Sequence, residues 1–138
     1  IGTNGAIILV LYFIAKILFI SEIFSINLKY LIIYPVLARL ATPVNAAFSD
    51  YARKNGMSNF IISQNSAFEG IFSIILAVAL SSLIFSFKGF ELFLGAFLFI
   101  IFFMQFVKKK IDGVTGDTMG AALELTTIFV LFLAIFLK

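Results

Sequence analysis

The sequence predicts an all-α fold, a bundle of about five transmembrane helices that forms a single domain over residues 1–138. Its residues are 62% hydrophobic and only 12% charged, whereas soluble domains carry about 25% charged residues. The hydrophobic residues gather in long runs, and no run alternates apolar and polar residues as a strand of a membrane barrel would. Because a backbone in lipid must satisfy its own hydrogen bonds, these runs are expected to be helices.

Five runs are long enough to cross a hydrocarbon core of about 30 Å, which takes about 17–25 helical residues. The first run contains the single charge Lys16 between positions 5 and 20, the second contains only Arg39, and the last contains only Glu124. The third and fourth runs contain no charged residue between positions 70 and 87 or between 92 and 107. The predicted spans are 5–22, 30–48, 69–87, 90–107 and 119–137.

The connections between these spans predict the orientation of the chain. The N-terminus and the loops 49–67 and 108–118 would share one side, and the turns 22–29 and 87–91 would share the other with the C-terminus. The first side carries the larger number of Lys and Arg residues, which indicates the cytoplasm. The polar segments 2–5, 50–56 and 112–117 fall on that side as well, so we expect a functional site there.

Residues that are absent exclude several kinds of chemistry. Without Cys or His there is no disulfide, thiolate nucleophile, cysteine zinc site or imidazole base. A net charge of +3 is too small and too scattered to indicate nucleic-acid binding. The chain begins with Ile1, and nothing basic precedes the first apolar run, so we expect a fragment or a processed product without a signal peptide.

Two carboxylates near the last span are the most informative polar residues. Asp117 and Glu124 are seven positions apart, which places them on one helical face about 10 Å apart with Gly120 and Ala121 between them. Such oxygen ligands suit Mg²⁺. Alternatively, Asp117 caps the helix, and two glycines four apart, at positions 116 and 120, form a helix-packing motif.

Arg39 lies within the second span between Pro35 and Pro43, which are expected to kink or break the helix. A broken helix at membrane depth is tolerated where it lines protein or water, so this one is expected to wall a cavity. There Arg39 would bind phosphate or neutralise Glu124. Lys16 either snorkels toward the interface or faces the bundle.

Three blocks of the sequence stand in a fixed order. They are Ile1–Ala6, followed by the run with Lys16; Tyr51–Met57, which follows the span with Arg39; and Gly113–Leu125. Gly113–Leu125 is similar to the C-terminal signature of the adenosylcobinamide-GDP ribazoletransferase, or cobalamin synthase, family, in which the other two blocks recur in the same order. On this resemblance the chain is identified as the C-terminal part of a family member.

The resemblance implies a Mg²⁺-dependent, multi-pass enzyme of the bacterial or archaeal cell (inner) membrane with its active face toward the cytoplasm. It would join adenosylcobinamide-GDP to α-ribazole or its 5'-phosphate and release GMP. Nucleic acid is not an expected partner. Asp117 would be the catalytic residue and metal ligand. The other implied substrate or phosphate contacts are Arg39, Arg53, Gly113, Thr115, Gly116 and Glu124.

The sequence departs from the family pattern at two points. Asp112 stands where members often carry Gly, and an acidic, His-containing motif of the family has no counterpart here. About half of the enzyme is therefore expected to be missing, so this chain alone is expected to be inactive. The expected partners of this chain are membrane lipid and either the missing half of the enzyme or a second copy of the chain.

Two other functions compete with this interpretation. A CDP-alcohol phosphotransferase also performs Mg²⁺-dependent chemistry at the membrane face, but its several Asp residues are not found around Ala52 and Arg53. A small transporter or scaffold subunit would use Arg39 and Glu124 as a buried pair or relay. A transporter needs its polar groups near the midplane, whereas here the polar segments cluster on one side.

Overall fold

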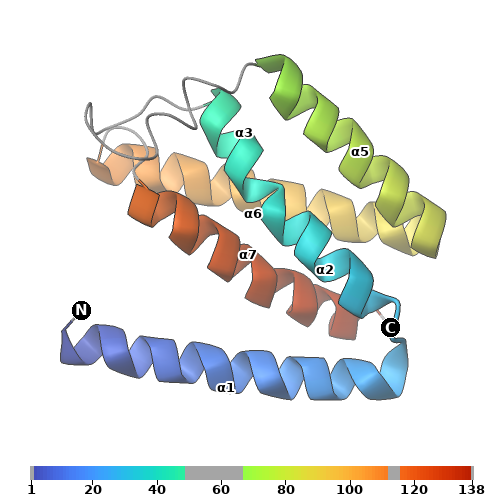
Figure 1. Cartoon of the computed structure of the whole chain (residues 1–138), viewed down its shortest axis with the longest axis horizontal. Coiled ribbons are helices and arrows are strands. Elements are labelled where there is room, and N and C mark those ends of the chain that lie inside the picture. Colours follow the sequence, from blue (N-terminus) through green and yellow to red (C-terminus); the bar gives the residue numbers. More distant parts are fainter. Residues whose placement is uncertain (1, 49–66, 112–115, 138) are drawn as a thin grey trace.

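The computed structural model describes residues 2–48, 67–111 and 116–137, and the regular structure of these residues is entirely α-helical. This confirms the all-α prediction for the described part of the chain. The helices, labelled as in Figure 1, are α1 (Thr3–Ile26), α2 (Tyr30–Arg39), α3 (Ala41–Phe48), α5 (Ala67–Phe85), α6 (Phe87–Ile111) and α7 (Gly116–Phe136).

Four of these helices, α1, α5, α6 and α7, are long and apolar enough to cross a membrane. The predicted span 30–48 is divided into α2 and α3, and each of these is too short alone. They follow one another along a single path (Figure 1), and 19 residues at 1.5 Å each cover about 28 Å. The length of the pair is compatible with the fifth crossing that the sequence predicts, and the four long apolar helices make the chain a multi-pass membrane protein.

The break between α2 and α3 falls at Leu40, close to the prolines that predicted it. Pro35 lies inside α2, which continues past it to Arg39. Pro43 lies in the first turn of α3, where its missing N–H costs no hydrogen bond. In a continuous helix its ring would clash with the backbone carbonyl four residues earlier, which favours a break before it. The N–H of Leu40 bonds to the carbonyl of Leu37, three residues back, which tightens the last turn of α2.

The connection between α5 and α6 is shorter than the predicted turn at 87–91. Only Ser86 separates the two helices, with a positive φ of 55°, and residues 87–91 belong to α6. The Ser86 N–H bonds to the carbonyl of Ser82 at 2.7 Å, so the left-handed residue ends α5 as a helix cap does. The turn prediction was wrong because the apolar pattern of α6 starts only after its first, polar turn.

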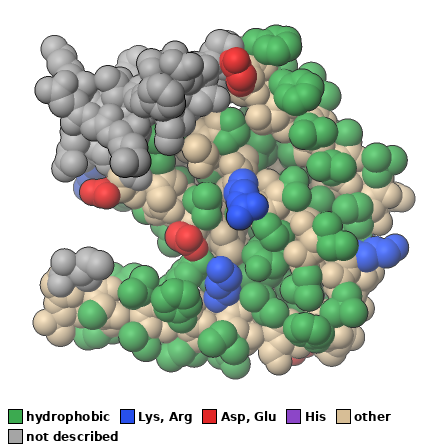
Figure 2. Space-filling model, viewed as in Figure 1, with side chains coloured by type: hydrophobic (Ala, Val, Ile, Leu, Met, Phe, Trp, Pro, Cys, Tyr) green, Lys and Arg blue, Asp and Glu red, His purple; other side chains and the backbone are tan. Residues whose placement is uncertain are grey.

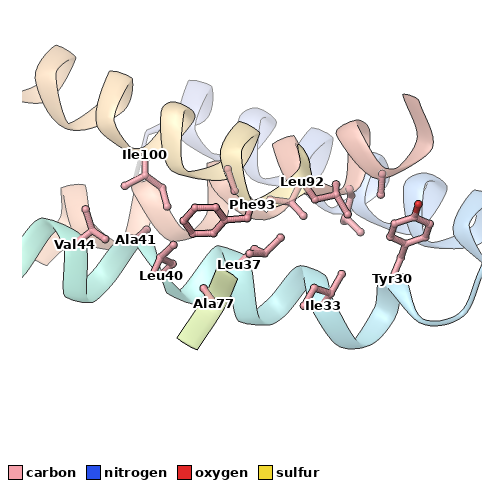
Figure 3. Packing of buried hydrophobic residues seen from close by; sticks show 14 of the residues in the cluster. Tyr30, Ile33, Leu37, Leu40, Ala41, Val44, Ala77, Leu92, Phe93 and Ile100 are labelled. Atoms are coloured by element: carbon pink, nitrogen blue, oxygen red, sulfur yellow. The ribbon is translucent and has the colours of Figure 1, made fainter. Parts of the chain in front are cut away.

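The core lies where α2, α3, α6 and α7 meet. Leu37 and Leu40 point toward Phe93 between α2–α3 and α6 (Figure 3), and Phe93 is 6% exposed. On α7, Leu131 and Ala134 are fully buried. In contrast, Ile23 is the only buried residue of α1 among the described side chains, which leaves most of that helix open to lipid.

Buried polar side chains in this core bond to their own helices. Asn45 donates to the carbonyl of Ala41 at 2.6 Å, Thr126 donates to that of Ala122 at 2.6 Å, and Ser81 to that of Ala77 at 2.8 Å. Such bonds to a carbonyl four residues earlier let a polar residue sit in an apolar bundle. No buried side-chain oxygen or nitrogen of the described residues lacks a partner.

The connections and termini of the described helices lie at two opposite ends of the bundle. The starts of α1 and α7 and the ends of α3 and α6 lie at one end, and the α1–α2 and α5–α6 connections lie at the other (Figure 1). This is the arrangement that the loop analysis predicted. Lys108, Lys109 and Lys110 belong to the last turn of α6 rather than to a loop, and their charges favour the negative end of its dipole.

The close approach of α5 and α6 requires Gly89. A Cβ at this position would overlap the carbonyl group of Ser81. This carbonyl belongs to the backbone of α5, so it cannot move aside as easily as the end of a flexible side chain. We expect Gly89→Ala to lower the free energy of unfolding by about 1–3 kcal/mol, the usual cost of overpacking. Reversible unfolding in mixed micelles would measure the loss.

Gly120→Ala is the matched control, because a Cβ there meets no atom within 4 Å. Equal stability of the two variants would contradict the described packing of α5 against α6.

Candidate functional site

Three charged residues from three predicted spans line one pocket. Lys16 of α1, Arg39 of α2 and Glu124 of α7 surround a volume of about 200 Å³, which we call the polar pocket. The broken helix therefore does line a cavity, since Pro35 and Ala38 form part of the wall. The remaining residues of the wall are Tyr34, Leu123 and Thr127.

A second cavity of about 500 Å³ lies between the N-terminal halves of α1 and α7, and we call it the apolar pocket. It shares Lys16 and Glu124 with the polar pocket and extends to Gly5, near the start of α1. In Figure 2 acidic and basic side chains meet above α1 on a face that is otherwise mostly hydrophobic. The other residues lining it are Ile8, Leu9, Tyr12, Phe13, Ala121 and Leu125.

The two helices that form the apolar pocket are joined at its inner end. The Tyr12 hydroxyl donates a hydrogen bond to the Glu124 carboxylate, and Lys16 lies over the Tyr12 ring, 5.6 Å from its centroid. Farther along the helices, the rings of Phe19 and Phe132 are 6.3 Å apart. In the described part of the chain no direct ion pair joins Glu124 to a cation, so the alternative role of Arg39 as the direct partner of Glu124 is not seen there.

The predicted face of the last span is present and open. Asp117, Gly120, Ala121 and Glu124 are all exposed along α7. Asp117 lies in the first turn of α7, where its negative charge interacts favourably with the positive end of the helix dipole. A Cβ added at Gly120 would meet no atom within 4 Å, so this glycine does not mediate packing between the helices that the structure describes.

Other predicted site residues fall at the edge of the described structure or beyond it. Arg39 is exposed at the C-terminal end of α2, and Gly116 is the first residue of α7. Arg53, Gly113 and Thr115 lie outside the described residues. The structure thus brings Arg39 and Glu124 together around one pocket, with Asp117 about two turns from Glu124 toward the end of the bundle.

Sequence reasoning missed the part played by Tyr12 and Tyr34, and it left the direction of Lys16 open. One signal was available for α1, because Tyr12 and Lys16 are four residues apart and thus share a face of an otherwise apolar helix. Their meeting with Glu124 is not readable from any spacing, since Tyr12 and Glu124 are 112 positions apart.

The described residues contain no cluster of three or more Asp, Glu, His or Cys side chains that would enclose a metal ion. Mg²⁺, however, is usually bound by one or two carboxylates together with water and substrate phosphates. Exposed Asp117 fits this open kind of site, whereas Glu124 is already engaged by Tyr12.

Comparisons with known proteins agree along nearly the whole chain. The family model described as cobalamin-5-phosphate synthase matches residues 1–135. The adenosylcobinamide-GDP ribazoletransferase of Clostridium novyi is 35% identical over 133 residues, which cover 93% of this chain and 52% of that protein. The proteins of the same name from Clostridioides difficile and Fusobacterium nucleatum are 31% and 30% identical, with 91% and 96% of this chain covered.

The matches cover 52%, 53% and 56% of the lengths of these three curated relatives, so this chain spans about half of each of them. No solved structure matches it.

Water access to the apolar pocket can be measured with single introduced cysteines, because the sequence contains none. Ala121 lines this pocket, whereas Phe132 is an exposed residue of the same helix outside it. A thiol reacts as its thiolate, which forms in water and not in lipid, so we expect Ala121→Cys to react at least about tenfold faster than Phe132→Cys with a charged thiol reagent. Mass spectrometry of labelled membranes would follow both rates.

Buried Ala134→Cys gives the background rate, since Ala134 is fully covered. Labelling of Ala121→Cys at that background rate would show that the pocket is closed to water.

Proposed function

Because this chain belongs to the cobalamin-5-phosphate synthase family, we propose that it takes part in a membrane-bound transfer of late cobalamin synthesis. In this reaction adenosylcobinamide-GDP is joined to α-ribazole, or to its 5'-phosphate, and GMP is released. The names of the relatives, which are 30–35% identical to this chain, support this activity.

The proposed transfer is an attack of a ribose hydroxyl on the phosphorus atom next to cobinamide. A new bond forms between that oxygen and phosphorus, the phosphoanhydride bond to GMP breaks, and the hydroxyl proton must be accepted. The site therefore has to hold a diphosphate, orient the hydroxyl and stabilise the charge that passes to the leaving group.

The observation that carries the proposal is the meeting of Arg39, Lys16 and Glu124 around one pocket, on the same face of α7 as Asp117. In the proposal Arg39 binds phosphate oxygens with its planar guanidinium, which suits bidentate contacts. Asp117 accepts the proton of the attacking hydroxyl or holds the metal ion, and Glu124 contacts substrate. Arg53, Gly113, Thr115 and Gly116 would also bind substrate.

Exposed Asp117 is the residue that would hold Mg²⁺, shared with the phosphates of the substrate. A bound Mg²⁺ would neutralise charge on the phosphate oxygens. We propose that the remaining ligands come from substrate, water and parts of the enzyme outside this chain, because the described residues contain no closed ligand cluster.

We propose further that the site faces the cytoplasm from the cell membrane. The end of the bundle that carries Asp117 also carries Lys108, Lys109 and Lys110, and a surplus of basic residues is typical of the cytoplasmic side.

Replacement of Asp117 tests the proposed function. In membranes that contain the complete protein, supplied with adenosylcobinamide-GDP, α-ribazole and Mg²⁺, we expect Asp117→Asn to lower the rate of transfer at least about a hundredfold. That is the scale of loss when one charge-stabilising contact in an active site is removed. The amounts of cobalamin product and GMP formed per minute measure the rate.

Glu22→Gln is the control, because Glu22 is an exposed carboxylate near the opposite end of α1. Normal transfer by Asp117→Asn at equal expression would remove Asp117 from the site. Absence of transfer by the unaltered protein would remove the proposed activity.

A further inference from the structure

The polar pocket lies well inside the bundle rather than at its end. At 1.5 Å per residue, Lys16 is about 20 Å along α1 from Thr3, and Glu124 is about 12 Å along α7 from Gly116. Charged side chains at such depth are costly and normally face a cavity or a partner. Lys16, Arg39 and Glu124 all line the polar pocket. The groups that occupy this pocket therefore determine how the charges of the three side chains are compensated.

The charges around this pocket do not cancel. Two cations, Lys16 and Arg39, face one carboxylate, and that carboxylate accepts a hydrogen bond from the neutral Tyr12 hydroxyl. No ion pair joins the cations to Glu124 in the described part of the chain. The pocket therefore carries an excess positive charge, which an anion would compensate.

The pocket is also built to admit an anion. Its volume of about 200 Å³ equals the share of six or seven waters in the liquid, at about 30 Å³ each, which leaves room for a phosphate group. The apolar pocket borders it at Lys16 and Glu124 and extends from there toward Gly5, near the start of α1. The Tyr34 hydroxyl adds a polar group to the wall.

We infer that Lys16 and Arg39 form a binding pair for a phosphate or diphosphate ester, and that Tyr12 keeps this pair available by holding Glu124. Without the phenol, the carboxylate would be drawn to Lys16, which already lies over the Tyr12 ring. Tyr12 is thus a positioning residue, and Lys16 is a binding residue in addition to those that the sequence indicated. Only the identity of the ligand rests on the proposed function, in which the diphosphate of adenosylcobinamide-GDP would occupy the pair.

Binding of inorganic pyrophosphate to the purified protein in a neutral detergent tests the pair without any transfer reaction. We expect Lys16→Gln and Arg39→Gln each to weaken binding at least about tenfold, as loss of one charge-assisted contact does. Lys16→Arg keeps the charge and is expected to bind within about threefold of the unaltered protein. Lys88→Gln, an exposed lysine at the opposite end of the bundle, is the matched control and should bind normally.

The role of Tyr12 has its own signature. Tyr12→Phe should weaken pyrophosphate binding, because Glu124 then competes for Lys16, but it should have no such effect in a Glu124→Gln background, measured against Glu124→Gln alone. A merely structural role of the phenol would give the same loss in both backgrounds, and that result would overturn the assignment of Tyr12.

The same measurement in nanodiscs separates the two sources of phosphate. At an ionic strength high enough to screen the negative surface potential of phosphatidylglycerol, pyrophosphate affinity that is equal in phosphatidylcholine and phosphatidylglycerol discs would identify a soluble phosphate ester as the ligand. Affinity lost in phosphatidylglycerol under the same conditions would identify a lipid headgroup. Both results support the pair. Lys16→Gln with unchanged affinity, or no pyrophosphate binding by the unaltered protein in detergent or phosphatidylcholine, would overturn it, whereas binding without transfer would overturn only the proposed function.

Discussion

The rest of this structure depends on the cost of placing charge inside a membrane. Lys16, Arg39 and Glu124 come from helices that are otherwise almost wholly apolar, and each would be unfavourable if it faced lipid. Packing of α1, α2 and α7 gathers these residues around one shared pocket, so that none of them stands alone on an apolar helix. The arrangement of the three helices and the chemistry of the pocket therefore have the same physical cause.

Elsewhere the bundle avoids such costs with local solutions. Buried Asn45 and Thr126 bond to carbonyls of their own helices, and the tight connection at Ser86 leaves few backbone groups outside the helices. The break at Leu40 is placed where Pro43 weakens the helix, and it brings Arg39 to the end of α2 beside the pocket. A break at this depth is tolerated because protein surrounds it, since Leu40 is only 3% exposed.

Much of this arrangement could be predicted from the sequence, because hydropathy and helical spacing are local properties. The all-α fold, the shared face of Asp117 and Glu124 and the broken helix at Arg39 follow from such patterns. The bond between Tyr12 and Glu124 could not be predicted, since it depends on which helices pack together. The turn at 87–91 was placed wrongly because a polar first helical turn resembles a loop in composition. The predicted contacts at Arg53, Gly113 and Thr115 stay predictions.

A structure of the protein in a lipid nanodisc with a non-reactive analogue of adenosylcobinamide-GDP would show where the diphosphate binds. We predict that the diphosphate lies between α1, α2 and α7, in contact with Lys16 and Arg39, and that the attacking hydroxyl would approach from the side of Asp117. A diphosphate bound at the end of the bundle where α1 meets α2, or on the surface of α5, would contradict it.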